Sequence, residues 1–431
     1  MTTKSRFSFF CLAMLLLSLL AIPAAGENWP NWRGPRLDGT SLAEGLPTTW
    51  SATENVRWRL EMPGPGPSTP IVWDDKILLT TADGEDLLLM AVDRAGKELW
   101  RQKISTGNYS KWNGETNAVS PSPSTDGKHV WVMTGTGVFS AFDLDGKKVW
   151  QTSLVEKYGE LNYFFGHAST PLLHGDRLYV LLLHTDAQLV LAFDKLTGQE
   201  VWRHERVTDA TKEGLHSYAS PVLWEHGDQQ QLIIHGGDHA TGHSLADGKE
   251  IWRVGGFNPK ENYNPMFRFV ATPVVHQQYV IAPSAKNGPV VAVDISKAKG
   301  NVTGGEAEVW RMDKGTPDVP SPLVHDGVVY LSRENGMLMA RDLKSGEELY
   351  VERVHSRPHR GSPVYADGKV FLMGIDGTVS VVKAGRSYEL LAQNKIDEHL
   401  AASLAIADGT IYLRTFKALY AIAPPPAKTG P

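Results

Sequence analysis

Short apolar runs rich in Val, Leu, Phe and Tyr recur along the chain after residue 54, each bounded by Gly or Asp turns. In one stretch, RLYVLLLH (177–184) is followed by the turn TDA and by QLVLAFD (188–194). The turn KLTG then leads into EVWRHER (200–206). Runs of this length and composition are typical of β-strands. After residue 26 no window keeps a 3.6-residue apolar period, so the pattern predicts an all-β chain.

Two phrases repeat in step with these strands. The first ends in an aromatic residue, as in AVDRAGKELW (91–100), AFDLDGKKVW (141–150), AFDKLTGQEVW (192–202), HSLADGKEIW (243–252) and ARDLKSGEELY (340–350). The second is a small residue followed by proline, with prolines at 70, 123, 171, 221, 273, 322 and 363, and it decays to ASLAI (402–406). The prolines are 41 to 53 residues apart. Eight units of this length indicate the four-stranded antiparallel blades of an eight-bladed β-propeller.

The two ends of the repeat region predict how the ring closes. The eighth unit (400–423) holds three strands, and ENVRWRLEM (54–62) matches a fourth strand through Trp58. We therefore expect the N-terminal strand to pair with the last blade, which leaves no open sheet edge. Seven blades with a stray hairpin are the alternative.

The aromatic phrase suggests a structural role. Its tryptophans fall on the predicted outer strands, where each can bury about 150–250 Å² against the neighbouring blade. We expect this docking role for Trp58, Trp100, Trp150, Trp202, Trp252 and Trp310. The aspartates of the phrase are expected to hydrogen-bond amides of the following turn. They are Asp93, Asp143, Asp194, Asp294 and Asp342.

Composition narrows the class of protein. A net charge of −5 over 431 residues gives no sign of nucleic-acid binding.

Residues 1–26 read as a secretory signal peptide, with a membrane anchor as the alternative, so we expect a periplasmic or secreted protein without a stable membrane span. The only cysteine, Cys11, lies in this segment. We expect an N-terminal arm at 27–53, the propeller at 54–423 and a disordered tail at 424–431.

The repeated phrase AxDxxTGKxxW resembles the tryptophan-docking motif of bacterial propellers with pyrroloquinoline-quinone (PQQ)-like repeats, most fully at Ala192, Asp194, Thr197, Gly198 and Trp202. NWPNWRGPRLDGTS (28–41) is similar to the N-terminal arm of secreted members. The resemblance implies the fold over residues 54–423. It does not imply one activity, because the same blades occur in alcohol dehydrogenases and in non-catalytic outer-membrane assembly proteins.

The chain departs from both branches of that family. The dehydrogenases carry an adjacent-cysteine disulfide and a calcium site of Glu, Asn and Asp, and neither has a matching position here. The assembly lipoprotein needs a lipidated cysteine after its signal, and this chain has none there. PQQ and calcium therefore remain possible cofactors and no cofactor is certain.

Polar residues near the starts of the predicted first strands form the candidate ligand site at the mouth of the axis. They are His167, His216, Arg268, His359, Arg360 and His399. Cationic groups gathered there would attract an anion, with tighter binding below about pH 6.5 as the histidines become charged. Solvated polar residues at a rim are the alternative.

Aromatic residues in the long connections before blades two to five suggest an aromatic side to the same face, namely Trp112, Tyr163, Phe165 and Tyr218. Such side chains suit a sugar, an aromatic ligand or a protein partner, and packing within the loops is the alternative. HGGDHATGH (235–243) places three histidines at four-residue intervals, but its glycines disfavour a helix and hence a metal site. We predict no metal site and no catalytic residue.

These observations favour a secreted or periplasmic propeller that binds a protein, or an anionic or carbohydrate ligand, through its axial face. The alternative is a PQQ- and calcium-dependent dehydrogenase with a cysteine-free site. A glycan-recognition or lyase-like propeller is a third possibility.

Overall fold

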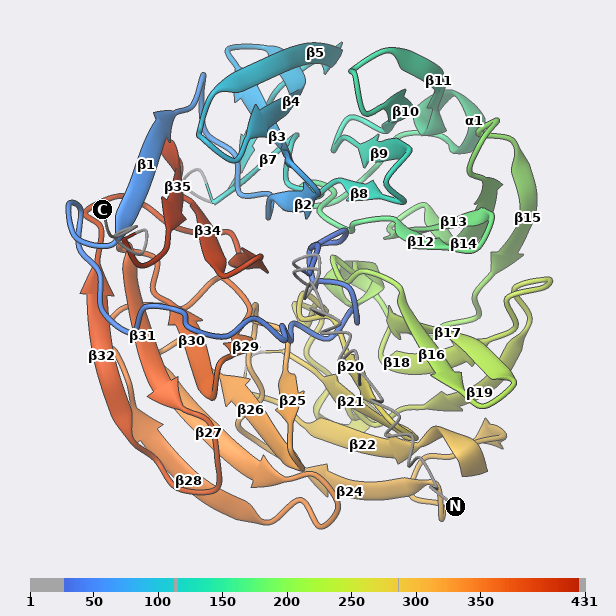
Figure 1. Ribbon diagram of the computed structural model, residues 1–431. Helices are drawn as coiled ribbons and strands as arrows, with labels where there is room; N and C mark the ends of the chain where they lie inside the picture. The colour runs from blue at the N-terminus through green and yellow to red at the C-terminus, as the bar shows by residue number, and fades with distance from the viewer. Residues whose placement is uncertain (1–26, 112–114, 286, 426–431) are drawn as a thin grey trace, which may run out of the picture.

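The structure, a computed structural model, describes residues 27–111, 115–285 and 287–425. Eight four-stranded antiparallel sheets surround a central axis, as Figure 1 shows. The predicted signal peptide, with Cys11, and most of the predicted tail lie outside the described residues. Within those residues, no helix has the length and apolar character needed to cross a membrane.

Blades 1 to 4 follow the chain in order. Blade 1 contains β2 (Ile71–Trp73), β3 (Lys76–Asp83), β4 (Asp86–Asp93) and β5 (Glu98–Thr106). Blade 2 contains β8 (Ser124–Thr125), β9 (His129–Met133), β10 (Val138–Asp143) and β11 (Lys148–Ser153). Blade 3 contains β12 (Leu172–His174), β13 (Arg177–His184), β14 (Ala187–Asp194) and β15 (Glu200–Glu205). Blade 4 contains β16 (Val222–His226), β17 (Gln229–Gly236), β18 (His239–His243) and β19 (Glu250–Val254), with β23 (Gly300–Asn301) added in parallel.

Blades 5 to 8 complete the ring. Blade 5 contains β20 (Val274–His276), β21 (Tyr279–Pro283), β22 (Val290–Asp294) and β24 (Glu308–Met312). Blade 6 contains β25 (Leu323–His325), β26 (Val328–Ser332), β27 (Met337–Asp342) and β28 (Glu348–Arg353). Blade 7 contains β29 (Val364–Ala366), β30 (Lys369–Met373), β31 (Thr378–Lys383) and β32 (Leu390–Lys395). Blade 8 contains β33 (Ala405–Ala407), β34 (Thr410–Arg414), β35 (Ala418–Ile422) and β1 (Val56–Glu61).

Short elements occupy some of the connections. They are the hairpin of β6 (Ser110–Lys111) and β7 (Thr116–Asn117), the helix α1 (Leu154–Tyr158), and the 3-10 turns η2 (Lys212–Leu215), η3 (Lys260–Asn262) and η4 (Ile295–Lys297). The connections that lead into first strands, and those between second and third strands, lie on one face of the ring, which we call the loop face. The opposite face, with the turns between first and second and between third and fourth strands, is the turn face.

The ring closes by pairing the two ends of the repeat region. β1 runs antiparallel to β35, with Trp58 opposite Ala421 and Leu60 opposite Leu419. Figure 1 shows these two strands side by side, one from each end of the colour scale. The prediction of eight blades closed by the N-terminal strand is therefore confirmed, and the seven-blade alternative is wrong.

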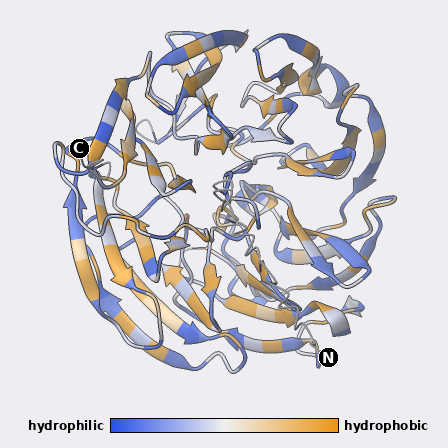
Figure 2. Cartoon of the chain, viewed as in Figure 1, coloured by the Kyte–Doolittle hydropathy of each residue, from blue (hydrophilic) through white to orange (hydrophobic). Residues whose placement is uncertain are grey.

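Burial along the strands reflects their distance from the axis. The middle strand β3 is buried at six consecutive positions, because blades pack on both of its faces, whereas the outer strand β5 alternates between half-buried and exposed positions. Figure 2 shows the resulting alternation of apolar and polar bands along the outer strands. Apolar packing between blades is therefore continuous around the ring.

Five of the six predicted docking tryptophans contact the next blade in the same way. The Trp150 indole N–H donates to the Lys195 carbonyl at 2.9 Å, and its ring covers Gly198. Gly198 has φ +67°, and a Cβ there would lie 2.6 Å from the Trp150 ring, so the turn requires glycine for both its conformation and the close approach. Equivalent indole bonds join Trp58 to Arg94, Trp100 to Leu144, Trp202 to Leu245 and Trp310 to Leu343.

Trp252 departs from this arrangement. Its indole N–H donates to the Gln231 side chain of its own blade at 2.7 Å. The next blade replaces the glycine turn with η4 and the segment that contains β23, which pairs with β19 beside Trp252. Trp252 still packs against the next blade, because it is buried in one apolar cluster with Val291 and Val293 of blade 5. Only the indole bond to a glycine turn is missing, since the insertion occupies that position.

Aspartates stabilise the turns that recur between the third and fourth strands of successive blades. Asp143 accepts the amides of Asp145 and Lys147 at 3.0 and 2.8 Å, and Asp194 accepts those of two residues in its own turn. Asp93, Asp294 and Asp342 make equivalent bonds. The predicted structural role of these carboxylates is confirmed.

A belt of hydroxyl groups encircles the axis, and it explains the small residue before each proline. The backbone N–H of each belt residue donates to the side-chain hydroxyl of the belt residue in the next blade, at 2.9 to 3.3 Å. The last bond runs from blade 8 back to blade 1, so the belt is closed. Its members are Thr69, Ser122, Thr170, Ser220, Thr272, Ser321, Ser362 and Ser403.

Residues 27–53 cross the turn face and close the axis there. Figure 1 shows this segment passing over the centre before it reaches β1. Trp29 exchanges two backbone hydrogen bonds of 2.8 Å with Val72 of blade 1. Arg33 is buried, and its guanidinium donates to the carbonyls of Pro322 and Pro363, the residues that follow the belt in blades 6 and 7. Burial lowers the pKa of Arg33 to about 10, so the side chain remains cationic at neutral pH.

Closure can be tested by replacing residues 56–61 with a Gly/Ser segment of equal length. The change keeps the preceding arm attached but removes the side chains of β1 that pack on β35. We expect loss of soluble, cooperatively unfolding protein, measured by thermal denaturation and size-exclusion chromatography. Removal of residues 424–431, which follow the last strand, should leave the melting temperature nearly unchanged. Equal tolerance of both changes would contradict the closure.

The contribution of the tryptophan contacts to stability remains a prediction. Trp150 and Trp202 are half-buried, so Trp150→Ala or Trp202→Ala should lower the free energy of unfolding by about 3 kcal/mol, the lower end of the range for large aromatic side chains in cores. Gly198→Ala should also destabilise, because its Cβ would meet the Trp150 ring. Denaturant titration of each variant measures these effects. Unchanged stability in either tryptophan variant would show that the contact does not hold neighbouring blades together.

Candidate axial binding site

A cavity of about 220 Å³ lies on the axis and opens on the loop face. All eight belt residues line it, so the closed hydrogen-bonded belt forms its lower wall. Phe165 and Tyr218, from the connections before blades 3 and 4, contribute aromatic surface. Charged side chains from four other connections complete the lining, namely Glu115, Arg268, Glu334 and Arg360.

Trp32 reaches this cavity from the opposite side of the ring. It belongs to the arm on the turn face, yet it lines the axial cavity together with the belt. It also lines a small void toward Pro171 and Pro221 on the turn face. The Trp32 side chain therefore occupies the channel near the belt, and the cavity is a cup whose floor is an indole.

Arg268, before blade 5, is held by carboxylates of neighbouring blades. Its guanidinium pairs with Asp318 at 2.9 Å and lies 3.8 Å from Glu213, which is buried. It also stands over the Phe165 ring at 5.1 Å, within the range of a cation–π interaction. The positive charge of Arg268 is therefore balanced within the protein.

Arg360, before blade 7, makes an equivalent set of contacts. It forms ion pairs with Glu115 of the connection before blade 2 and, at 2.8 Å, with Glu334 between β26 and β27. Burial opposes the charge of Arg360, but the ion pairs with Glu115 and Glu334 together more than offset this and raise the pKa of Arg360. Burial and the neighbouring Asp318 carboxylate raise the pKa of Glu334.

The expected surplus of positive charge at the axis mouth is therefore wrong. The two arginines are paired with carboxylates, three of which lie at positions not equivalent to the polar residues before the prolines. An anion entering the cavity would have to compete with these carboxylates. The structure brings Arg268 and Arg360 into the same cavity, as expected, but not as free cations.

The four histidines of the predicted site do not line the cavity. His167 bonds the Ser169 carbonyl through Nε2, and His216 bonds the Thr185 hydroxyl at 2.9 Å. Both rings pack around the buried Tyr163. His167 and His216 thus stabilise the connections of blades 3 and 4 from within.

His359 and His399 are similarly engaged elsewhere. His359 hydrogen-bonds the Ser332 hydroxyl at 2.7 Å, and His399 packs against Phe416. Burial lowers the pKa of His359 to about 4, that of His216 to about 4 and that of His167 to about 3. It also lowers the pKa of His399. The rings of His167, His216 and His359 therefore stay neutral near pH 6. They cannot cause the expected tightening of anion binding below pH 6.5.

The predicted aromatic face divides into two parts. Phe165 and Tyr218 line the cavity, with their rings 6.0 Å apart. Tyr163 is buried among histidines, and its hydroxyl accepts the Leu183 amide. Trp112 lies outside the described residues. Tyr163 therefore packs within the loops, whereas Phe165 and Tyr218 line the cavity.

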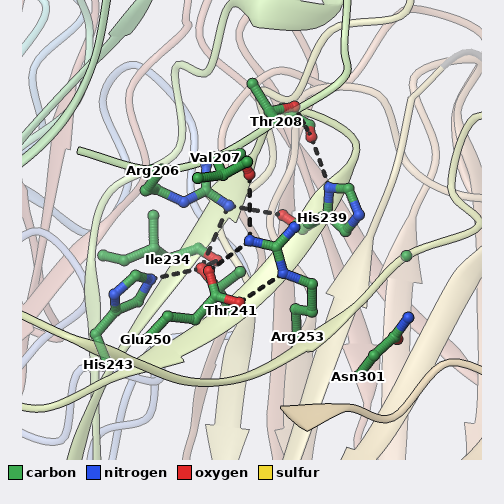
Figure 3. Close-up of polar contacts among 12 residues, drawn as sticks. Arg206, Val207, Thr208, Ile234, His239, Thr241, His243, Glu250, Arg253 and Asn301 are labelled. Atoms are coloured by element: carbon green, nitrogen blue, oxygen red, sulfur yellow. Dashed lines mark hydrogen bonds and ion pairs between the residues drawn. The ribbon is translucent and has the colours of Figure 1, made fainter. Parts of the chain in front are cut away.

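The histidine-rich segment 235–243 holds no cluster of ligands. His235 and His239 lie on different strands. The His239 ring bonds the Gly237 carbonyl and the His243 ring bonds the Thr241 hydroxyl, so the two rings have different partners (Figure 3). His243 bonds Thr241, which also accepts from the buried Arg206. Among the described residues, no group of three or more His, Cys, Asp or Glu side chains could hold a metal ion.

The residues around the axial cavity also fit PQQ and calcium poorly. Calcium takes six to eight oxygen ligands, and the carboxylates that line the cavity already face Arg360. PQQ is a tricarboxylate and needs cationic partners, whereas both arginines are paired. The cavity is also below the roughly 300–1,000 Å³ usual for larger ligands.

Known proteins resemble this chain in sequence. An assembly protein of Yersinia pestis, outer membrane protein assembly factor BamB, is 26% identical over 288 residues, which are 64% of this chain and 66% of that protein. The chain thus matches just under two thirds of that relative. The protein of the same name from Moranella endobia (strain PCIT) is 23% identical over 338 residues, or 76% of this chain and 77% of that protein.

Solved structures share the fold. BamB from Moraxella catarrhalis superposes with a TM-score of 0.63 at 14% identity, over 85% of this chain and 98% of that one. A quinohemoprotein alcohol dehydrogenase from Comamonas testosteroni superposes with a TM-score of 0.66 at 12% identity, over 94% and 82%. The family model described as outer membrane protein assembly factor BamB matches residues 85–352 and 305–424. Because this match covers most of the chain, the protein belongs to that family of propellers with PQQ-like repeats.

Proposed function

We propose that this protein is a periplasmic or secreted binding or scaffold protein that acts through the loop face of its propeller. The observation that carries the proposal is the cup on the axis, which within the described residues is lined by Trp32 of the arm and by connections of the loop face. Because the arm occupies the turn-face end of the axis, a ligand can reach the lining side chains from the loop face. The ionisable groups described above form ion pairs or are buried among other side chains. We therefore expect the protein to recognise its partner by shape and hydrogen bonding.

Exposed apolar side chains on the loop face support a protein partner there. Phe164 is 52% exposed and Met266 is 45% exposed, and they belong to the connections before blades 3 and 5. Val207, before blade 4, is 75% exposed. The relatives named as assembly factors of outer membrane proteins are consistent with a protein partner. Apolar anchors with a polar surround are the usual composition of such interfaces.

The location in the cell envelope rests on the sequence of residues 1–26 and on the same relatives. An apolar stretch after Lys4 and Arg6, followed by small residues, is typical of a cleaved signal. The dehydrogenase alternative receives support only from the shared fold, since the cavity residues fit PQQ and calcium poorly.

Photo-crosslinking tests which face binds. A photoreactive amino acid is placed at Phe164 or Met266, and at the exposed Leu42 or Leu196 of the turn face as matched controls. In the native envelope, we expect the two loop-face positions to crosslink to one and the same protein, identified by mass spectrometry. Phe164→Glu should then weaken binding of that purified protein by about tenfold, with an unchanged melting temperature.

Crosslinks that form from Leu42 and Leu196 but not from the loop face would contradict the proposal. Dye reduction that depends on added PQQ, calcium and an alcohol would instead support the dehydrogenase. Both experiments use the full-length mature protein.

A further inference from the structure

Three aromatic residues line the cup on the axis. The Trp32 indole reaches it through the ring from the turn face, and Phe165 and Tyr218 stand on the side of blades 3 and 4. On the turn face the buried anchors of the arm are Trp29 and Arg33, and the Arg33 guanidinium lies 5.6 Å from the Trp32 ring, within the range of a cation–π interaction. Trp32 also lines the cup, so its side chain can contact what enters from the loop face.

The belt adds a ring of hydrogen-bond donors to this cup. Each belt hydroxyl accepts one backbone N–H from the neighbouring blade, and among the described residues none of the eight donates to a protein acceptor. A hydroxyl has one hydrogen to donate and can accept two hydrogen bonds. Eight hydroxyl hydrogens are thus available to an occupant that presents oxygen atoms.

The upper part of the cup adds acceptors without adding net positive charge. Glu115 and Glu334 supply carboxylate oxygens, and each already faces Arg360. Arg268 is paired with Asp318. Two guanidiniums already face four carboxylates around the cup, so an anion would be repelled, and desolvating any charged occupant there would be costly. A neutral occupant that both donates and accepts hydrogen bonds costs less to desolvate, and the hydrogen bonds it forms in the cup offset that cost.

We propose that the cup binds one neutral pyranose ring, with the C–H face of the sugar against Trp32 and its hydroxyl groups on the belt and on Glu115 and Glu334. This inference rests on the proposed binding role of the loop face. A cavity of about 220 Å³ suits one such ring better than a large planar cofactor. The sugar is the end of a glycan or a free monosaccharide, since both present the same ring.

Calorimetry with three pairs of probes tests the ligand class. Methyl β-D-glucopyranoside, methyl β-D-galactopyranoside and methyl α-D-mannopyranoside are neutral, while glucuronate, galacturonate and mannosamine are charged. We expect at least one neutral glycoside to bind, at up to about 20 mM, with an affinity that does not change as salt is raised to about 0.5 M. Its charged counterpart should bind about tenfold more weakly.

Tryptophan variants locate the sugar. Binding should alter indole fluorescence in the wild-type protein and in Trp73→Phe, a turn-face control. Trp32→Phe should lose that fluorescence change and weaken the affinity severalfold, and Trp32→Ala should weaken it about tenfold. Trp32→Phe retains a ring in the channel, so the test does not depend on the alanine variant being folded.

Three results would overturn the inference: no binding by any neutral glycoside, tighter binding by the charged counterpart, or an unchanged fluorescence response in Trp32→Phe. If crosslinking from Phe164 succeeds while every neutral glycoside fails, the carbohydrate inference is wrong and the proposed function stands. If a glycoside binds as expected but the loop face yields no crosslinks, the protein partner is wrong instead.

Discussion

A closed ring of backbone-to-hydroxyl hydrogen bonds determines how the eight blades meet. Each bond joins the start of one first strand to the next, and the last bond returns from Ser403 to Thr69. A residue before proline is held in an extended conformation, and the proline itself has no N–H to satisfy. Ser or Thr in that position can therefore point its hydroxyl at the neighbouring blade. The belt satisfies eight buried amides and fixes the width of the axis at one level.

The remaining contacts take their positions from this belt. Tryptophans on the outer strands contact the glycine turn of the next blade at the periphery, so neighbouring blades are joined both at the axis and at the rim. The arm inserts Arg33 against the prolines that follow the belt and places Trp32 in the channel. Since the described part of the arm crosses the axis on the turn face, the cup and its paired charges face the connections of the loop face.

The architecture could be predicted from the sequence because its contacts recur with each unit. Glycine turns, aspartates and tryptophans repeat at fixed spacing, and the missing fourth strand was visible at both ends. The site was less predictable. The small residue before proline repeats in the sequence, but nothing in the sequence shows that its hydroxyl bonds the next blade. Glu115 and Glu334 lie in connections that have no repeated position. Trp32 lies far along the chain from the site it enters. The sequence does not show that the histidines are buried, and burial lowers the pKa of His167 to about 3.

The most direct measurement is the stability of two variants at one belt position. Thr170→Val keeps the shape of the side chain but leaves the buried Ser122 amide without its acceptor, whereas Thr170→Ser keeps the hydroxyl. Denaturant titration should show Thr170→Val less stable by about 1–3 kcal/mol, with Thr170→Ser close to wild type. Equal stability of the two variants would contradict the account, because the belt bond would then contribute nothing to holding the blades around the axis.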